Sequence, residues 1–491
     1  MLVTAAALIP LLGRKILAAR DEAIYAEVAR EMLGHNWLLP MWHFHPWPEK
    51  PPLAIWLTAL CFHAFGVNAF VARLVSALAG VGIVGIVHFE AARLRNLRTA
   101  WLTTAILLTT LGFLHVCERG EMDAPLTLAC LVALAALARV RNGDSRGWYA
   151  FWIASAAAVM IKGAASVTLL LTLVILYVWR QLARHAPAKT STSMRRDFLL
   201  GLLAFLCLAL PWHLYMLHRL GTGFLREYLG FHVIYRALAP WGGHPTSWWY
   251  YGLALLAYAS PWVLLFPYAL FRAARKPELS ELLVFALVVL VLFSAMSTRA
   301  PRYIFPAYPA LAWITADAID PWLRKQSGKA FLGFAAAGLA ICGLSIPLTR
   351  HLRLRLDGAA ATLSVGRSDR EAPRLLALAL QQTPSQNPAQ DPILLWQEDV
   401  AMQEMPTLLF YIHRPMQQVY LVHLPSTLGE AKRYADPEPL RNFVNAQPKI
   451  ILLEKQLAAE IPPDLDFHLI AQGKTLEVGT IQKDAIAGKL L

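Results

Sequence analysis

The chain has 491 residues, of which 57% are hydrophobic and only 16% are charged, and its formal net charge is +13. Soluble domains carry roughly 25% charged residues, so this composition excludes an ordinary soluble protein and predicts a polytopic membrane protein. Basic loops that orient a membrane protein explain the net charge, and anionic lipids are the alternative partner. Nucleic acid is not an expected partner.

Apolar stretches follow one another along the first 350 residues. Residues 2–12 are too short for a span of about 20 residues, so we extend the first predicted helix through residues 13–19. Further spans are predicted at 70–92, 99–117, 122–140, 148–162, 163–179, 198–217, 248–270, 281–297, 302–318 and 330–349. The predicted fold class is therefore mainly α, with about eleven transmembrane helices.

Every second connection between these spans is basic, at residues 93–98, 139–146, 180–196, 272–276 and 324–329. The positive-inside rule places these connections in the cytoplasm. The other connections then face the periplasm of a bacterium or the lumen of a eukaryotic compartment. Their polar segments at 20–33 and 53–66 are predicted to form interfacial helices.

The pattern changes after residue 350. The segments ILLW (393–396), QVYLV (418–422), KIILLE (449–454) and FHLIA (467–471) are typical of short buried strands, and helical patterns such as 398–412 lie between them. We predict a transmembrane catalytic domain over residues 1–350 and a small α/β domain over 351–491, on the outer side. Its expected role is a structural cap or an acceptor-docking module.

Two outer segments carry charges beside apolar sequence. Asp21 opens a segment with apolar residues Ile24, Val28 and Met32 on one helical face. A helix cap would explain Asp21, and a cap also fixes a side chain for chemistry. Lys50 precedes two prolines, which hold it in an extended conformation. A lysine that reaches to the membrane surface is the structural alternative, but it does not explain the rigid prolines.

Later outer loops add more charges. The segment ERGEMDAP (118–125) places Asp123 and two other acids at the mouth of a helical hairpin, where they could simply cap a helix. Arg236, Arg302 and Tyr303 follow in further outer loops. Arginine binds phosphate through its planar fork of donors. Acids and cations together on one side predict a charged substrate at the membrane surface.

A metal site is a weaker prediction. His43 and His45 form an H-x-H pair next to Glu49, and His232 and His244 lie in a later outer loop. A divalent-metal site could assemble from such residues. Histidine beside tryptophan is also common at membrane interfaces, so the spacing alone leaves both interpretations open. The five cysteines show no CxxC spacing and are not expected to bind metal or to form a disulfide framework.

In this order, the motifs RDEAIYAEVAREML, EKPPLAIWLTALCFHAFG, ERGEMDAPLTL, PWGGHPTSWWYY and RAPRYIFPAYPALA resemble the aminoarabinose transferase of lipid A and its relatives. That family belongs with the protein O-mannosyltransferases among the polytopic glycosyltransferases of the GT-C type. The resemblance covers roughly residues 10–320. It implies inverting transfer of a sugar, on the outer face, from a polyprenyl-phosphate donor.

The resemblance also implies roles for single residues. Asp21 and Asp123 match the catalytic acids of the first and second outer loops. Lys50 matches a lysine that contacts the lipid phosphate, and Glu49 a glutamate that can hold a divalent Zn, Mg or Mn ion. Arg236 matches a phosphate-binding arginine, and Tyr303 matches an aromatic position in the late outer loop. With the neighbouring Arg302, they complete the expected lipid-phosphate site. One departure is Ile24, which stands where relatives usually have arginine.

The expected function is transfer of the sugar to lipid A or another envelope glycolipid, in the inner membrane of a bacterium. A protein O-glycosyltransferase with a protein acceptor is the alternative within the same class. A secondary transporter is the alternative from another class, but its ionisable residues would lie near the middle of the spans, in matching halves. A non-catalytic envelope scaffold would leave the gathered charges unexplained.

Overall fold

The structure is a computed structural model that describes residues 2–325 except 11, 14–15, 18–20, 183–191 and 240–246. Further along, it describes residues 340–341, 343–345, 347–348, 352, 371–382, 392–396, 407–408, 410–412, 414, 416–420, 438–444, 447–473 and 476–483. The chain divides into two compact units. The first is Met1–Arg14, Asn36–Leu39 and Pro48–Ala360, and the second is Lys15–His35, Pro40–Trp47 and Ala361–Leu491. The functional division predicted at residue 350 stays a prediction.

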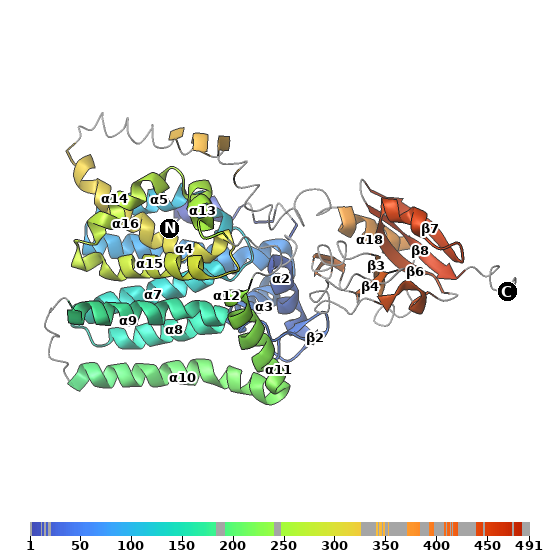
Figure 1. The fold of residues 1–491 in the computed structure, drawn as a ribbon, viewed down its shortest axis with the longest axis horizontal. Helices are drawn as coiled ribbons and strands as arrows, with labels where there is room; N and C mark the ends of the chain where they lie inside the picture. Colours follow the sequence, from blue (N-terminus) through green and yellow to red (C-terminus); the bar gives the residue numbers. More distant parts are fainter. Residues whose placement is uncertain are drawn as a thin grey trace. The chain divides into compact units, whose positions relative to one another are not determined.

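The first unit is a bundle of helices, many of which run side by side (Figure 1). Its helices are α1 (Leu2–Leu8), α3 (Leu53–Phe65), α4 (Ala69–Leu94), α5 (Leu97–Leu108), α6 (Leu111–Cys117), α7 (Asp123–Arg141), α8 (Gly147–Lys162), α9 (Val167–Leu182), α10 (Thr192–Leu220), α11 (Thr222–Leu225), α12 (Arg236–Leu238), α13 (Tyr250–Ala259), α14 (Phe266–Ala273), α15 (Ser280–Ala295) and α16 (Ala307–Leu323). A π-helix, Arg226–Tyr235, joins α11 to α12. The predicted mainly α class is confirmed.

Within the described residues, four helices are long and apolar enough to cross a membrane: α4, α7, α10 and a helical segment that ends with α15. Two bent pairs would raise this number to six if each pair is one span. The predicted count of eleven therefore stays a prediction, and most of the span predicted at 330–349 lies outside the described residues.

Two of the predicted spans are bent in the structure. The segment 99–117 bends by 71° between α5 and α6, and the segment 248–270 bends by 119° after α13. At the first bend, the hydroxyls of Thr109 and Thr110 each donate to a carbonyl one turn earlier, at 2.7 Å, which gives the last carbonyls of α5 a local partner. At the second bend, Pro261 has no N–H with which to continue the helix.

Basic connections that the structure describes, at 93–98 and 139–146, meet at one end of the bundle, which we call the basic end. Nη1 of Arg95 lies 2.7 Å from Oε1 of Glu278, and Nη1 of Arg141 lies 2.6 Å from Oε2 of Glu281. Arg95 also pairs with Asp317 on α16. These contacts bring together connections that are far apart in the sequence, as expected if they face the same side of a membrane.

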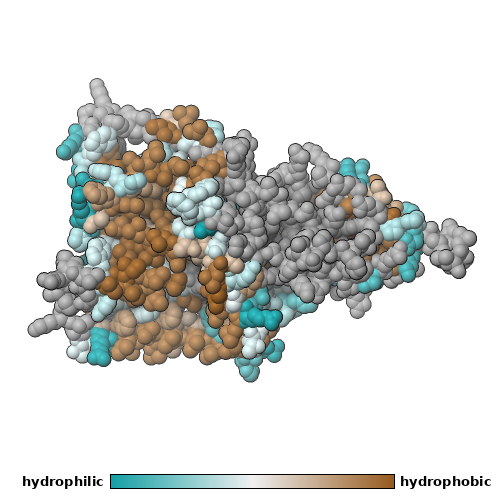
Figure 2. Space-filling view, viewed as in Figure 1, coloured by the Kyte–Doolittle hydropathy of each residue, from teal (hydrophilic) through white to brown (hydrophobic). Residues whose placement is uncertain are grey.

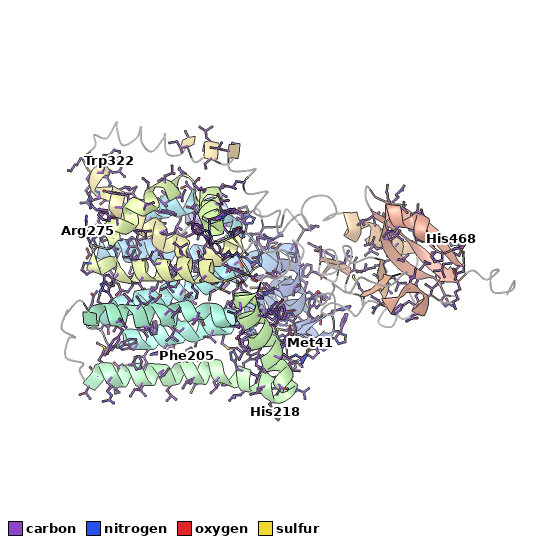
Figure 3. All side chains as sticks on the ribbon, viewed as in Figure 1. Met41, Phe205, His218, Arg275, Trp322 and His468 are labelled. Atoms are coloured by element: carbon purple, nitrogen blue, oxygen red, sulfur yellow. The ribbon has the colours of Figure 1, made fainter. Side chains whose placement is uncertain are left out.

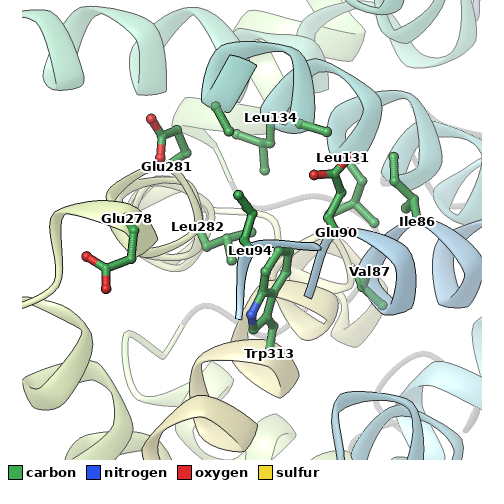
Figure 4. A pocket seen from close by; sticks show the side chains of 12 residues that line it. Ile86, Val87, Glu90, Leu94, Leu131, Leu134, Glu278, Glu281, Leu282 and Trp313 are labelled. Carbon is green, nitrogen blue, oxygen red and sulfur yellow. The ribbon is translucent and has the colours of Figure 1, made fainter. Parts of the chain in front are cut away.

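A pocket with an empty volume of about 420 Å³ lies between α4, α7, α15 and α16 at the basic end (Figure 4). Its walls are mostly aliphatic, and Glu90, Glu278 and Glu281 contribute carboxylates. Each carboxylate pairs with an arginine of a basic connection. The pocket therefore lies beside the ion pairs at this end of the bundle, about 12–22 Å along α7 from that helix's first residue.

The long helix α10 keeps an apolar outer surface. Leu203, Leu210 and Leu214 are exposed on it, with exposed fractions of 55%, 46% and 53%. Figure 2 shows brown, hydrophobic residues over much of the visible bundle surface, with teal residues toward its ends. Aliphatic side chains on the outside of a helix bundle are what contact with lipid tails requires. The predicted polytopic membrane protein is thereby supported by its surface.

The second unit contains α2 (Asp21–Glu31) and a two-stranded hairpin of β1 (Met41–Trp42) and β2 (His45–Pro46). Helix α2 starts where the sequence predicted it. It is buried on nearly all sides and not on one face alone, because Glu27 pairs with Arg30 and Glu31 accepts a hydrogen bond from the N–H of Phe44. The predicted apolar face of Ile24, Val28 and Met32 is buried, and the acids on the other faces are buried too.

The same unit contains a six-stranded sheet in the order β5-β4-β3-β6-β8-β7. The strands are β3 (Ile393–Trp396), β4 (Met416–Tyr420), β5 (Glu438–Pro439), β6 (Lys449–Glu454), β7 (Leu465–Gln472) and β8 (Leu476–Lys483), and helix α18 (Glu371–Gln382) contacts β7 and β8. Neighbouring strands from β5 to β6 are parallel, and β8 and β7 continue the sheet in antiparallel pairs. The four predicted strands are present, whereas β5 and β8 were not predicted. Most of the predicted helix 398–412 lies outside the described residues.

Candidate functional site

A buried ion pair lies at the end of the bundle opposite the basic end. Asp123 is the first residue of α7, where a carboxylate suits the positive end of the helix dipole. Lys162 is the last residue of α8, and its Nζ lies 2.6 Å from Oδ1 of Asp123. The side chains are 4% and 15% exposed, respectively. Because a buried charge without a counter-ion is costly, each residue of the pair holds the other in place.

Further charges surround this pair, and together they form what we call the acid–cation cluster. Nε of Arg302 lies 3.3 Å from Oε2 of Glu121 and 3.9 Å from Oδ2 of Asp123. Nε of Arg119 lies 3.1 Å from Oε1 of Glu121. The cluster thus brings three cations, Arg119, Lys162 and Arg302, to two buried carboxylates at one end of the bundle.

Tyr303 lies within the acid–cation cluster. The Nζ atom of Lys162 is 5.5 Å from the centre of its ring, and the guanidinium carbon of Arg302 is 5.8 Å from that centre. Both distances are within the range of cation–π attraction. The structure therefore brings together Asp123, Arg302 and Tyr303, three residues that the sequence had singled out in two different loops.

A second group, which we call the His232 cluster, forms around Glu49 and Lys50. Nε2 of His232 lies 3.3 Å from Oε2 of Glu49 and 3.5 Å from Oε1 of Glu227. Nζ of Lys50 lies 3.2 Å from Nδ1 of the same ring. A lysine ammonium can only donate, so Nδ1 accepts and the proton of the neutral ring is on Nε2, facing the two carboxylates. Lys50 lies outside any helix, as its prolines predicted.

The His232 cluster has the donor set of a metal site. The ligand atoms of Glu49, Glu227 and His232 all lie within 4.8 Å of one another. One imidazole nitrogen and two carboxylate oxygens suit zinc. Within the described part of the chain, His43 and His45 do not join this group. The Nε2 atom of His43 instead accepts the backbone N–H of Met416, at 3.1 Å.

Arg236 follows the π-helix, four residues after His232. Its guanidinium carbon lies 6.0 Å from the ring centre of Phe231. Its carbonyl oxygen accepts the N–H of Thr298 at 3.2 Å, and the N–H of Ser297 bonds to the next carbonyl, at 2.9 Å. These bonds join the end of the π-helix to the loop that carries Arg302, so they link the His232 cluster to the acid–cation cluster.

Asp21 is the first residue of α2 in the second unit, and it is half-buried. At the other end of this helix, burial and, to a lesser extent, the nearby Glu27 carboxylate raise the pKa of Glu31 to about 8. Backbone N–H groups of His43 and Phe44, which have φ of +53° and +63°, act in the opposite direction. The catalytic role of Asp21 stays a prediction.

The sequence analysis assigned no role to Lys162 or Glu227. In the sequence, Lys162 stands between a long apolar stretch and a glycine. An ionisable residue next to a predicted membrane span is a signal of function. Glu227 precedes His232 by five residues, which is the spacing of a π-helical hydrogen bond. A helical-wheel analysis at 3.6 residues per turn does not reveal that pairing.

Comparison with known proteins gives an independent result. Residues 18–220 match the family described as dolichyl-phosphate-mannose-protein mannosyltransferase. This part of the chain is similar to that glycosyltransferase family. The family resemblance predicted from its motifs is thereby confirmed.

Two curated relatives carry the name undecaprenyl phosphate-alpha-4-amino-4-deoxy-L-arabinose arabinosyl transferase. The protein from Pseudomonas aeruginosa is 29% identical over 352 residues, which are 68% of this chain and 61% of that protein. The protein from Shewanella sediminis is 28% identical over 319 residues, which are 63% of this chain and 57% of that protein. The chain thus spans about three fifths of the length of these relatives.

Solved structures show the same fold. The crystal structure of ArnT from Cupriavidus metallidurans bound to undecaprenyl phosphate matches with a TM-score of 0.74 at 20% identity, over 98% of this chain and 96% of that one. The archaeal oligosaccharyltransferase AglB from Archaeoglobus fulgidus matches with a TM-score of 0.51 at 12% identity, over 93% of this chain and 69% of that one.

Proposed function

We propose that the chain is a membrane glycosyltransferase that moves a sugar from a polyprenyl-phosphate donor to lipid A or another envelope glycolipid. The observation that carries the proposal is the acid–cation cluster, in which three cations and Tyr303 surround Asp123 and Glu121 at one end of the bundle. The relatives named after an undecaprenyl-phosphate-linked aminoarabinose support the donor class.

In the proposed reaction, an oxygen of the acceptor attacks the anomeric carbon of the sugar. The bond from that carbon to the phosphate oxygen breaks, and its electron pair leaves with the polyprenyl phosphate. A single displacement of this kind inverts the anomeric centre. Negative charge grows on the leaving phosphate, so the cations Lys50 and Arg236 stabilise the transition state more than the ground state.

Asp21 and Asp123 have different proposed roles. Asp123 is already engaged by Lys162 on one oxygen and faces Arg302 with the other, so it orients these cations. Asp21 either takes a proton from a hydroxyl acceptor or stabilises the oxocarbenium-like centre. A phosphate acceptor already carries a nucleophilic anion and needs no strong base.

We also propose that Glu49, Glu227 and His232 hold a divalent metal ion, which would add positive charge near the donor phosphate. Nε2 of His232 would be a ligand of this ion, and the ring proton would then have to be on Nδ1. Lys50 would lose that acceptor and could donate to the donor phosphate instead. Metal analysis of purified protein should find about one zinc per chain, and the His232→Ala variant should lose it. Equal metal content in both proteins would contradict this assignment.

The proposed location is a bacterial inner membrane, with the acid–cation cluster on the periplasmic side. The shared basic end supports this orientation. Reporter fusions after Arg146 and Arg196 should report cytoplasm, and a fusion after Ala359 should report periplasm. A cytoplasmic signal from the last fusion would contradict the orientation.

Purified protein in detergent tests the activity itself. With a synthetic undecaprenyl-phosphate sugar and a lipid acceptor, the wild-type protein should release undecaprenyl phosphate in step with formation of the glycolipid. A protein acceptor is the second candidate, because the matching family is named for protein mannosyltransferases. Transfer to peptides in place of lipids would favour that candidate, and no turnover of any polyprenyl-phosphate sugar would contradict the proposal.

A further inference from the structure

A close contact joins α8 to the π-helix. Gly163 directly follows Lys162 and ends α8 with φ of +47° and ψ of −112°. Tyr228 lies on the π-helix, next to Glu227. A Cβ atom built on Gly163 would lie only 2.2 Å from the Tyr228 hydroxyl oxygen and 3.1 Å from its Cζ. Real Cβ atoms essentially never approach other atoms so closely, so glycine is required both by the backbone and by the contact.

Tyr228 is also fixed from its other sides. Its ring stacks on Phe224, with 5.1 Å between the centroids and 6° between the planes. Its hydroxyl oxygen lies 3.2 Å from Nε2 of His213, whose Nδ1 lies 2.8 Å from the carbonyl oxygen of Ala209. A carbonyl only accepts, so Nδ1 carries the ring proton and Nε2 accepts from the tyrosine. Burial raises the pKa of Tyr228, so the hydroxyl keeps its proton to donate.

The contact lies between the two charged clusters. Lys162, the neighbour of Gly163, pairs with Asp123. The π-helix that carries Tyr228 also carries Glu227 and His232, and π-helical turns are frequently found at functional sites. The bond from the N–H of Thr298 to Arg236 fixes the other end of this segment. The packing of Tyr228 on Gly163 therefore determines where the His232 cluster lies relative to Lys162.

We propose that Tyr228 and Gly163 are positioning residues that set the spacing between the Asp123–Lys162 pair and the residues that bind the donor phosphate. The identity of that donor rests on the proposed function, whereas the packing does not. A misplacement of about 1 Å in an active site can cost about a hundredfold in rate. A methyl group at Gly163 would have to displace Tyr228 by at least that much.

The chain offers a matched control. Gly221 has φ of +57° and ψ of −144°, close to the values at Gly163, but a Cβ there would meet nothing within 4 Å. Gly163→Ala and Gly221→Ala therefore introduce similar backbone strain, and only the first introduces a collision. Gly163→Ala should weaken binding of undecaprenyl phosphate about tenfold or more, and Gly221→Ala by less than about threefold. Native mass spectrometry of the protein in detergent measures both affinities.

A second substitution tests the contact by rescue. Tyr228→Phe removes the oxygen at 2.2 Å, so the double variant of Gly163→Ala with Tyr228→Phe should bind within about threefold of Tyr228→Phe alone. Hydrogen exchange in residues 226–235 should be faster in Gly163→Ala and return toward the wild-type rate in the double variant. A merely structural glycine would lower stability without this selective rescue.

The outcomes separate the two proposals. If Gly163→Ala behaves like Gly221→Ala in both affinity and exchange, or if Tyr228→Phe does not rescue it, the positioning role is wrong. If wild-type protein binds no undecaprenyl phosphate but the exchange pattern and its rescue appear, the positioning contact stands and the proposed donor is wrong.

Discussion

The ammonium group of Lys162 lies 2.6 Å from a carboxylate oxygen of Asp123, although the two residues are 39 positions apart in the sequence. This contact joins the first residue of α7 to the last residue of α8. In a helical hairpin, the start of the first helix lies beside the end of the second. The packing of α7 on α8 therefore places Lys162 next to Asp123, the acid at the end of the motif ERGEMD. The pair is the centre of the acid–cation cluster.

Removal of Lys162 should therefore act on both stability and turnover. Lys162→Met leaves the Asp123 carboxylate buried without its main partner, which costs roughly 3–5 kcal/mol in folding free energy. We expect sugar transfer to fall about a hundredfold or more. The double variant with Asp123→Asn should be more stable than Lys162→Met alone, because no buried charge remains. Thermal unfolding and transfer assays in detergent check both expectations.

A pair at the basic end provides the control for this prediction. Arg141 and Glu281 form a contact of the same length, 2.6 Å, with similar burial. Arg141→Met should lower stability in a comparable way but leave transfer per folded molecule unchanged. If Arg141→Met and Lys162→Met reduce transfer equally, the acid–cation cluster has no special role.

Lys50 and Arg236 should act on the lipid phosphate. Lys50→Ala and Arg236→Ala each remove a charge-assisted contact, and we expect each loss to cost about 2–4 kcal/mol in the transition state for transfer. Rates with an undecaprenyl-phosphate donor, measured on folded protein in detergent, test the expectation. Wild-type rates in both variants would refute the assignment.

Asp21 can be tested by one conservative substitution. Asparagine caps a helix about as well as aspartate, but it supplies no negative charge. Asp21→Asn should therefore express and insert normally while transfer falls about a hundredfold or more. A near wild-type rate would mean that Asp21 is only a helix cap, and Asp123 would become the better catalytic candidate.

Glu31 should make the second unit less stable at alkaline pH. Its carboxyl has a pKa of about 8 in the folded chain, well above its ordinary value of 4.5, so the folded chain holds a proton that the unfolded chain has released. Its contribution to stability is complete below pH 4.5 and is lost as the pH rises through about 8. Glu31→Gln should raise the unfolding temperature at pH 8.5 and change it little at pH 4.5. The same dependence of unfolding temperature on pH in the wild type and in Glu31→Gln would contradict this role of Glu31.

The sequence was enough to predict features that depend on composition and neighbouring residues alone. The prolines after Lys50 keep it out of a helix, and Asp21 opens α2 where an acid favours a helix start. The alternation of basic and other loops predicted that the basic loops lie at the same end of the bundle. These features depend on composition and on neighbouring residues, so one sequence was enough to find them.

Features that depend on packing were not predictable in this way. The partner of Glu49 lies in a π-helix about 180 residues later in the chain. The pattern of apolar residues does not show that this segment is π-helical. The two helix bends arise from hydroxyl-to-carbonyl bonds and from Pro261, within stretches whose hydropathy is uniform. The burial of Glu27 and Glu31 depends on an arginine and on backbone N–H groups that only the fold brings into contact.

Mass spectrometry of lipid A from a deletion strain tests the central claim most directly. The strain should lack a sugar-sized mass increment on lipid A or another envelope glycolipid, and the wild-type gene should restore it. A gene that carries Asp123→Asn should restore less than about a hundredth of it. Identical glycolipids in the deletion and parent strains, under conditions in which the protein is produced, would contradict the claim.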